Sequence, residues 1–462
     1  MLFFLVVGCA AVSELDKDPS NEPDFENTAV DFDSITVGIH ESFARYLAED
    51  PSNQAVIIEF TNDASPLFGE AYTDPNFNTT IHRLSNLNIS NHFYSQLQAF
   101  SHDNTYVLMM EGDTENTVDI LVKRLVDMEV VFRFDDLAAY TSARWHPSNF
   151  ATLVHYDSNL DPLVHVQYTD VSTGETETIF TFPSEYVDVL ATPSSEELSR
   201  DGKWMAGMVL KNDGNAAIFS LNLESRSLGA SIDFDQLYAG PCTPDPQYGP
   251  LDPDWVGVSP LGTYLMVQWA ASGTNRCEGL ESYDITTGEY LGHVTAEHPH
   301  SDMQVLSDGV TEVLVSGELA GPSSTQTYVN GQEGSDLDEY YFALSYRELP
   351  GQLGGESPPN YLYTTDWIFE HVSCRGPFGY CLVTAYDNAQ NGFYDPLEGE
   401  LFILKLDGTG LIRLAHHHAS GSGYWEQPRA SMSNDGRYVI FDSDWDLSGV
   451  NTAAYMIDLL AQ

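Results

Sequence analysis

A short turn motif recurs along this chain and constrains its fold more than any other feature. In five places a serine opens a tight turn, most often containing Asp-Gly, and an apolar strand follows. These turns start at Ser101, Ser199, Ser259, Ser307 and Ser433, and a degenerate copy runs from Arg144 to Asn149. An Asp-Gly pair supplies the positive φ that a tight β-hairpin needs. We therefore expect a hairpin at each copy.

A second hairpin follows most copies of the motif, as at Tyr168–Glu175 and Tyr283–Glu289. Two hairpins make four antiparallel strands, and the units recur every 45–60 residues or so, about the spacing of β-propeller blades. Seven units begin near His92, Tyr140, Pro193, Pro253, His298, Phe369 and Tyr424. The sequence therefore predicts an all-β, seven-bladed propeller of four-stranded antiparallel blades over residues 51–462, with a closing strand from residues 52–85. A tandem of β-sandwiches is the structural alternative.

The first residues resemble a bacterial lipoprotein signal. Leu2–Val7 is a short apolar run, and Gly8-Cys9 follows it in the order that precedes lipidation of the cysteine. The run is too short to span a bilayer, which needs about 20 apolar residues. We expect residues 1–12 to be a signal with a lipidated Cys9, and residues 13–50 to be an acidic flexible tether. The protein would then be exported and lipid-anchored to the bacterial cell envelope, at the outer membrane or in the periplasm. A buried N-terminal strand is the alternative.

The charge balance excludes two classes of partner. The formal net charge is −51, from 69 acidic and 18 basic residues. Such a surface repels nucleic acid and anionic bilayers, so we exclude nucleic acid and expect membrane contact only through the lipid anchor. Because 42% of the residues are hydrophobic, the chain can still bury a core. We expect an acidic, well-hydrated monomer.

Four cysteines remain when Cys9 is assigned to lipid. An even number of cysteines in an exported protein suggests two disulfides. We expect the pairs Cys242–Cys277 and Cys374–Cys381, and two other connectivities are formally possible.

Four stretches in the last third of the chain resemble oligogalacturonate lyases and propeller-type ulvan lyases. They are His300–Asp302, His371–Arg375, Leu414–His418 and Gln427–Ser431. The serine-turn repeats are similar to those of TolB-type propellers over residues 52–462. The resemblance implies the propeller fold. In the resembling lyases, a metal ion on the propeller axis binds the substrate carboxylate. Propellers host many activities, so the fold does not assign one.

His300, His371, Cys374 and His417 are candidate ligands of one divalent metal ion. His300 and His371 stand near the start of consecutive inner strands, and His417 precedes the next blade on the same side. Neutral imidazole suits zinc or manganese better than calcium, and a thiolate from Cys374 favours zinc. The alternatives are a surface histidine run, histidines that are hydrogen-bonded between blades, and a structural disulfide at Cys374.

The second unit contains candidate catalytic residues. His155 and His165 flank a short loop and can face each other across one hairpin, and Tyr156 is adjacent to the first of them. A lyase needs a base and an acid, and the protonation states of His and Tyr can be tuned for these tasks. The resembling ulvan lyases use His and Tyr in this way. Packed strand side chains are the alternative. His92 and Tyr94 open the first unit and could line the same mouth.

Arg375 and Arg429 are the candidate clamp for a substrate carboxylate, because guanidinium binds a carboxylate through two parallel hydrogen bonds. The chain has no Gly-x-Ser-x-Gly elbow and no phosphate-binding loop, which argues against a serine hydrolase and a nucleotide-binding protein. The residues and the resemblance together predict an envelope protein that cleaves an acidic polysaccharide, such as ulvan, by β-elimination. The alternative is a non-catalytic propeller that binds a glycan or an envelope protein.

Overall fold

The computed structural model of this chain describes most of the predicted propeller. The described residues are 64–86, 89–112, 118–134, 143–157, 164–190, 194–195, 197–244, 252–271, 273, 276–297, 300–320, 341–365, 371–385, 397–420, 426–445 and 452–460. The predicted signal, Cys9 and the tether lie outside them. Within these ranges, no helix has the length and apolar character needed to cross a bilayer.

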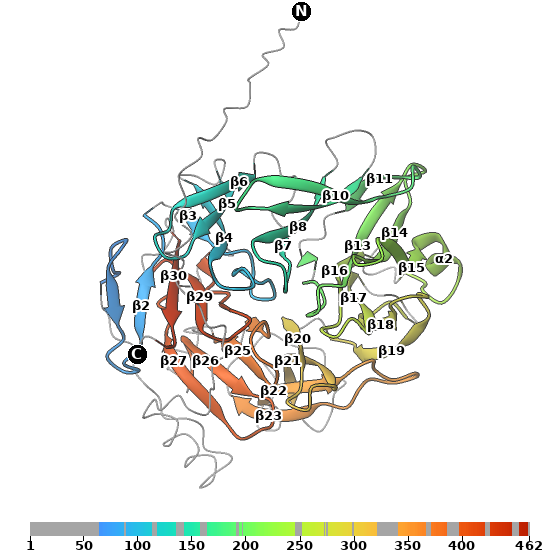
Figure 1. Cartoon of the computed structure of the whole chain (residues 1–462). Coiled ribbons are helices and arrows are strands. Elements are labelled where there is room, and N and C mark those ends of the chain that lie inside the picture. The colour runs from blue at the N-terminus through green and yellow to red at the C-terminus, as the bar shows by residue number, and fades with distance from the viewer. Residues whose placement is uncertain are drawn as a thin grey trace, which may run out of the picture.

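Seven sheets follow one another around a central axis (Figure 1). The prediction of an all-β, seven-bladed propeller is therefore confirmed. Five blades have four strands, and blades 4 and 7 each have a fifth. In the part of the chain that the structure describes, the one α-helix is α2 (Phe234–Ala239), which follows the outer strand of blade 3.

The strands of blades 1 to 4 are described first. Blade 1 contains β3 (Ile89–Asn91), β4 (Tyr106–Gly112), β5 (Asp119–Arg124) and β6 (Val130–Phe134). Blade 2 contains β7 (Arg144–Trp145), β8 (Thr152–Asp157), β9 (His165–Asp170) and β10 (Glu175–Thr181). Blade 3 contains β11 (Tyr186–Leu190), β13 (Trp204–Lys211), β14 (Ala216–Asn222) and β15 (Ser227–Asp233). Blade 4 contains β12 (Ser194–Ser195), β16 (Asp252–Val258), β17 (Tyr264–Ala271), β18 (Gly279–Asp284) and β19 (Tyr290–Thr295).

The remaining three blades complete the ring. Blade 5 contains β20 (Ser301–Val305), β21 (Glu312–Ala320), β22 (Tyr341–Glu348) and β23 (Asn360–Thr365). Blade 6 contains β24 (His371–Ser373), β25 (Tyr380–Thr384), β26 (Glu400–Lys405) and β27 (Leu411–His416). Blade 7 contains β28 (Ser431–Met432), β29 (Tyr438–Ser443) and β30 (Ala453–Asp458), together with β1 (Ala71–Thr73) and β2 (Thr80–Arg83).

Blade 7 is closed by strands from the N-terminal part of the chain. β2 pairs antiparallel with β30, with Ile81 opposite Ile457, and β1 pairs with β2 at the rim. Ile81 is fully buried in the core that blades 6 and 7 share. The predicted closing strand within residues 52–85 is confirmed, and it joins the two ends of the propeller.

Blade 3 departs from the predicted unit boundaries. Its first strand begins at Tyr186 instead of near Pro193. After this strand the chain moves to the next sheet, where β12 pairs in parallel with β16 of blade 4. The short stretch near Pro193 therefore belongs to the edge of blade 4, which explains why the repeat pattern placed the boundary too late.

The serine hydroxyl organises the turns that start at Ser101, Ser199, Ser259 and Ser433. In the turn of blade 5, Asp308 accepts the backbone N–H groups instead. Ser199 Oγ donates to Asp201 Oδ1 at 2.7 Å and accepts from the backbone N–H of Trp204 at 3.0 Å, while Gly202 has a φ of 72°. In blade 2 a histidine occupies the place of the serine. His146 Nδ1 accepts from the backbone N–H of Asn149 at 3.1 Å, so this imidazole caps its turn in the same manner.

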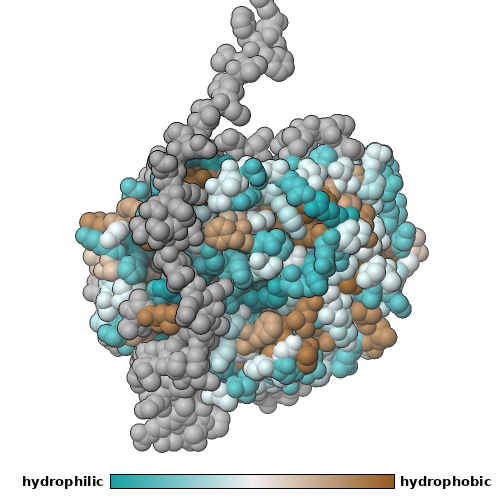
Figure 2. Space-filling view, in the orientation of Figure 1, coloured by the Kyte–Doolittle hydropathy of each residue, from teal (hydrophilic) through white to brown (hydrophobic). Residues whose placement is uncertain are grey.

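The cores lie between neighbouring sheets, and the surface is mixed in character. Figure 2 shows small groups of hydrophobic residues among hydrophilic ones on the face that it views. Large apolar side chains that reach solvent include Val126 and Leu353, which lie in turns of different blades. Single exposed apolar residues of this kind are normal on a globular surface.

Both predicted disulfides are present. Cys242–Cys277 links the segment after α2 to the residues just before β18 of blade 4, and Cys374–Cys381 links two adjacent strands of blade 6. Their sequence separations are 35 and 7 residues. On the chain-entropy account the longer loop stabilises the fold by about 4 kcal/mol and the shorter by about 2 kcal/mol.

Thiol titration and unfolding measurements test these two bonds together. Under denaturing, non-reducing conditions we expect no free thiol from the four internal cysteines. The double variant Cys242→Ser/Cys277→Ser should lose about 4 kcal/mol of unfolding free energy, against about 2 kcal/mol for Cys374→Ser/Cys381→Ser. Two free thiols would show that one bond is absent, and equal losses would contradict the entropic account.

Candidate functional site

One end of the propeller axis collects side chains that can perform chemistry. His371, the first residue of β24, lies opposite Thr384, the last residue of β25. The start of the first strand of a blade and the end of its second strand therefore lie at the same end of the propeller. The residues around the axis at this end come from blades 1, 5, 6 and 7. We call the following set the axial site: His92, Tyr94, His300, His371, Arg429 and Asp442.

A tyrosine and a histidine from different blades meet at the centre of the axial site. Tyr94 OH lies 3.0 Å from His371 Nε2, and the two rings meet edge to face. On its other side His371 stacks against His300, with 4.6 Å between ring centroids and 6° between ring planes. His371 is buried, Tyr94 is partly buried and His300 is exposed, so solvent reaches this group of rings.

The electrostatics of the axial site keep His371 neutral. Burial first, and then the charges of His300, Arg429 and His92, hold the pKa of His371 well below its usual range. A neutral imidazole nitrogen can accept a hydrogen bond from the Tyr94 hydroxyl. Arg429 lies with its guanidinium carbon 6.0 Å from the centroid of the Tyr94 ring. The arrangement is therefore a tyrosine–histidine pair beside a fixed positive charge, which suits proton transfer next to an anion.

Residues 92–98 interrupt the inner strand of blade 1 and cross the axis, and we call them the axis-crossing segment. Gln96 Nε2 donates to the carbonyl oxygen of Ser301 in blade 5. Gln98 Nε2 donates to the carbonyl oxygen of Met432 in blade 7 at 3.2 Å. Figure 1 shows the blue chain between β3 and β4 reaching towards the centre. This segment brings Tyr94 to blade 6.

Next to the axial site, arginine side chains bind a carboxylate and backbone carbonyl groups. Arg375 donates to both carboxylate oxygens of Asp302, at 3.0 Å for the Nε–Oδ2 contact. Arg200 donates to the carbonyl oxygens of Cys374 and Arg375, at 2.5 Å each. Burial raises the pKa of Glu197, while Arg144 and Arg375 act in the opposite direction.

The two predicted clamp arginines occupy different places. Arg375 is buried and committed to Asp302, so it is not available to a substrate carboxylate. Arg429 lies within the axial site, although it too is only 1% exposed. Its backbone φ of 31° is in the left-handed region, which a non-glycine residue adopts only when its surroundings hold it there.

The four predicted metal ligands are not assembled into a metal site. His417 Nε2 lies 2.9 Å from the carbonyl oxygen of Ala385, and its Nδ1 accepts from Ala419, so both ring nitrogens are engaged. Burial lowers the pKa of His417 to about 3. Cys374 is disulfide-bonded.

The remaining pair, His300 and His371, does not converge on one point. Lone pairs of imidazole nitrogens lie in the ring plane, and two stacked, parallel rings cannot both direct them at one ion. Within the described ranges, no group of three or more His, Cys, Asp or Glu side chains is placed to hold a metal ion. The residues present therefore do not fit the predicted zinc site.

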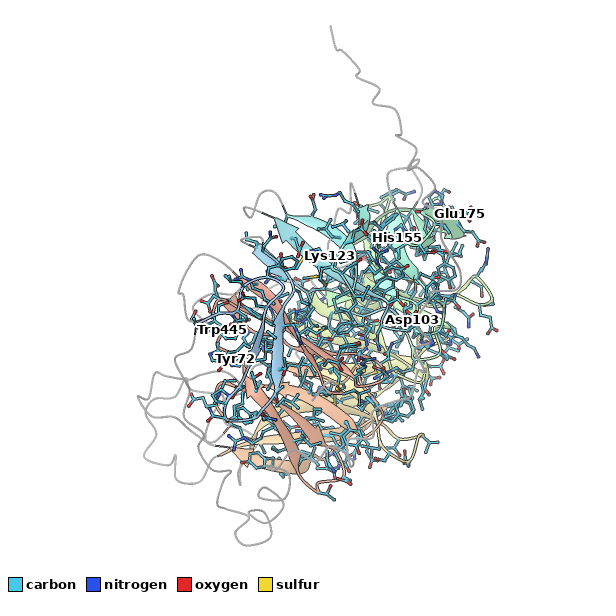
Figure 3. The ribbon with its side chains drawn as sticks, turned by 60° about the vertical axis from the view of Figure 1, so that its left-hand side comes forward. Tyr72, Asp103, Lys123, His155, Glu175 and Trp445 are labelled. Carbon is cyan, nitrogen blue, oxygen red and sulfur yellow. A yellow bond between two sulfur atoms is a disulfide. The ribbon has the colours of Figure 1, made fainter. Side chains whose placement is uncertain are left out.

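The neighbouring histidines serve blade 7 instead. His416 donates its backbone N–H to Asp74 at 3.1 Å, which fixes the connection between the closing strands β1 and β2. His418 stacks on Trp445, with 4.2 Å between centroids. Tyr72 meets Trp445 edge to face, and Figure 3 shows these two side chains close together. The histidine run is therefore part of the packing at ring closure.

His155 and His165 lie on one face of blade 2. In the register of β8 and β9, His155 is opposite Gln167 and His165 is opposite Asp157, so the two histidines are diagonal neighbours. His155 Nε2 lies 2.8 Å from Thr169 Oγ1, and His165 Nδ1 lies 2.9 Å from a threonine hydroxyl of β10. Both side chains are buried and hydrogen-bonded across strands (His155 is labelled in Figure 3).

Tyr156 points away from these two histidines, because neighbouring strand residues face opposite sides of a sheet. Its ring is part of the core between blades 2 and 3 and meets Phe219 edge to face. Burial raises the pKa of Tyr156 above its usual value. The structure thus brings His155 and His165 together on one face but leaves Tyr156 on the other.

Tyr94 is a residue of the axial site to which sequence reasoning gave little weight. It follows β3 in a segment without a recognisable motif, and only the aromatic residues near His92 hinted at a role. Its partner His371 is in blade 6, far away in the sequence.

The fold and the axial site define a seven-bladed β-propeller with a polar, histidine-rich axis end. Among solved structures this chain is similar to oligogalacturonate lyase from Vibrio parahaemolyticus, with a TM-score of 0.54 and 12% identity over 84% of this chain and 96% of that one. It is also similar to an oligogalacturonate lyase in complex with manganese, with a TM-score of 0.54 and 13% identity over 85% of this chain and 96% of that one. TolB from Acinetobacter baumannii matches at a TM-score of 0.32 and 16% identity over 64% of this chain and 59% of that one.

These comparisons concern the fold. The expected resemblance to the oligogalacturonate lyase propeller is confirmed at that level. No protein family matches the sequence, and no curated protein matches it.

Proposed function

We propose that the axial site binds a uronate residue of an acidic polysaccharide and cleaves the chain by β-elimination. The observation that carries the proposal is the Tyr94–His371 pair, 3.0 Å apart and next to Arg429 at the end of the axis. The fold shared with oligogalacturonate lyases supports it. The substrate class fits the site because the fixed positive charge of the buried Arg429 beside Tyr94 favours an anionic group there, although the protein as a whole is strongly acidic.

In this reaction the Tyr94–His371 pair moves the protons. A base removes the proton next to the uronate carboxylate, the glycosidic C–O bond at the β-carbon breaks, and a C=C double bond forms. The leaving oxygen takes up a proton, so the step is redox-neutral and releases an unsaturated uronate. Neutral His371 can take the proton next to the carboxylate, and the Tyr94 hydroxyl can donate its proton to the leaving oxygen. Proton transfer from His371 to Tyr94 across the 3.0 Å contact then restores both residues.

Arg429 supplies electrostatic stabilisation in this scheme. Negative charge builds on the carboxylate as the proton leaves, and a fixed guanidinium in a water-poor site stabilises it. One similar structure is described with manganese. Because His300 and His371 do not converge on a common point, no step is assigned to a metal ion here.

We also propose that the protein works outside the cytoplasm, with Cys9 anchored by lipid to the bacterial envelope. Two disulfides support an oxidising compartment. A strongly acidic surface would then face a medium whose salt screens its repulsion from a polyanionic substrate. We expect the acidic polysaccharide to be the main partner.

Incubation with defined polysaccharides tests this function. Chelator-treated protein, before and after adding back zinc or manganese, is mixed with ulvan and with pectate, and ultraviolet absorbance reports unsaturated uronate. We expect absorbance to rise without added metal. Tyr94→Phe should lower kcat by a factor of about 10²–10⁴, because the transferable proton is lost. Tyr455→Phe is the matched control, because Tyr455 is buried and lies away from the axis. Its hydroxyl oxygen is 2.9 Å from Ser65 Oγ.

Each outcome of this experiment decides between alternatives. Full activity in Tyr94→Phe would refute the assignment of the pair. Activity that appears only with added metal would refute the metal-free scheme. Saturable binding of a polysaccharide by calorimetry, without any absorbance change, would favour a non-catalytic glycan-binding propeller.

A further inference from the structure

Asp442 connects the two parts of the axial site that come from blades 1 and 7. Its Oδ1 accepts from the backbone N–H of His92 at 3.1 Å, and its Oδ2 lies 3.1 Å from His92 Nδ1. The same Oδ2 lies 3.8 Å from Arg429 Nη2. Asp442, His92 and Arg429 are all no more than 1% exposed, so these contacts form where water is excluded.

His92 is the first residue of the axis-crossing segment, and Tyr94 is only two residues further along. A contact that fixes the backbone of His92 therefore limits where the Tyr94 hydroxyl can lie. The far end of the segment is fixed separately, since the backbone N–H of Gln98 donates to Glu197 at 2.7 Å and the carbonyl oxygen of Leu97 accepts from Ser431. Asp442 is thus the anchor at the Tyr94 end.

Asp442 also faces the strained arginine. Arg429 has a φ of 31° and is buried beside the Tyr94 ring. Holding a cation in this position costs free energy unless a negative charge is near, and Asp442 supplies one from the adjacent strand β29. The backbone of the two elements is tied as well, because the N–H of Asp442 donates to the carbonyl oxygen of Pro428.

We infer that Asp442 is a positioning residue: its carboxylate fixes His92 and Arg429 and thereby places Tyr94 against His371. The expected effect on kcat rests on the proposed function, whereas the placing of Tyr94 by Asp442 is a property of the structure alone. Asp442 is buried and moves no proton of the substrate. It acts through Tyr94 and Arg429, so its loss should reduce kcat and leave substrate binding nearly unchanged.

Two substitutions separate the two contacts of Asp442. Asp442→Asn keeps an oxygen that can accept from the His92 N–H but removes the charge opposite Arg429, and Asp442→Ala removes both. We expect kcat to fall about tenfold in Asp442→Asn and about 10²-fold in Asp442→Ala, because displacement of a reacting group by about 1 Å lowers the rate by about this much. KM should stay within about twofold of the value for the parent protein. Asp458→Asn is the matched control, because Asp458 pairs with Arg437 in the same blade, away from the axis.

Amide hydrogen exchange provides a readout that needs no turnover. In Asp442→Ala the His92 amide should exchange about tenfold faster, together with its neighbours up to Tyr94, whereas the Gln98 amide should not change because it donates to Glu197. Asp442→Asn and Asp458→Asn should stay close to the parent protein. The Arg429→Gln/Asp442→Asn double variant should lose less activity than the two single losses combined, since both act on one contact.

The results distinguish failure of this inference from failure of the proposed function. If no polysaccharide is cleaved, the proposed function fails, and the exchange measurement alone decides on Asp442. Unchanged exchange at His92 in Asp442→Ala would overturn the inference. Parent-like kcat in both Asp442 variants, or an equal loss in Asp458→Asn, would overturn it as well. If Asp442→Ala does not fold, the kcat, KM and double-variant results for Asp442→Asn decide.

Discussion

Asp302→Ala is expected to lower the free energy of unfolding by about 3–5 kcal/mol. Asp302 lies on the axis in blade 5, is 1% exposed, and accepts two hydrogen bonds from Arg375 and one from the backbone N–H of Cys374. Burial raises the pKa of Asp302, although Arg375 acts against this, so desolvation of the carboxylate is only partly offset. Removing the carboxylate leaves a buried guanidinium without its counter-charge, which costs more than the pair itself contributes.

Urea denaturation of matched variants measures this cost. Asp119→Ala is the control, because Asp119 also pairs with an arginine, Arg133, but both side chains are nearly half exposed. That variant should change stability by no more than about 1 kcal/mol. The double variant Asp302→Leu/Arg375→Met should recover most of the loss, since it removes both charges. Similar losses in Asp302→Ala and Asp119→Ala would contradict the axial ion pair.

Ile81→Asp is expected to cost more than about 4 kcal/mol, because it places a charge in the sheet that closes the ring. Ile81 is fully buried, lies opposite Ile457 and packs in the core that contains Phe441. An aspartate there loses the apolar contacts and has no cation among the residues of that core. We expect blade 7 to open and the closing strand to become sensitive to protease.

Thermal unfolding and limited proteolysis test this prediction. His82→Asp is the control, since His82 is the next residue of β2, faces the other side of the sheet and is partly exposed. It introduces the same charge on the same strand and should have a much smaller effect. Equal losses would mean that the strand tolerates no charge on either face, and no loss in Ile81→Asp would mean that closure does not depend on this strand.

The fold was predictable because the turn chemistry repeats. Ser199 with Gly202, and Ser433 with Gly436, show the same hairpin in sequence and in structure. Closure could be predicted as well, since seven units need a further strand to complete the last sheet. The boundary near Pro193 could not, because a parallel edge contact such as β12 with β16 leaves no periodic signal.

The site was predictable only in part, for a physical reason. His371 and His300 were found because each stands near the start of a repeated strand, and Arg429 because a guanidinium can bind a carboxylate. Their partner Tyr94 stands in a segment that leaves the repeat and crosses the axis, so its position depends on contacts with distant blades. Tyr156 was misjudged because one residue along a strand changes the face completely.

The closing strand has a consequence for the order in which the chain acquires its structure. β1 and β2 are synthesised before the other described strands of the propeller, yet their sheet cannot form until β30 has been made. During synthesis these early strands expose unpaired backbone N–H and C=O groups and apolar side chains such as Ile81. Exposed strands of this kind can pair with other chains and aggregate. The ring can therefore become complete only after the last blade leaves the ribosome, and the slow step of folding should be this long-range pairing.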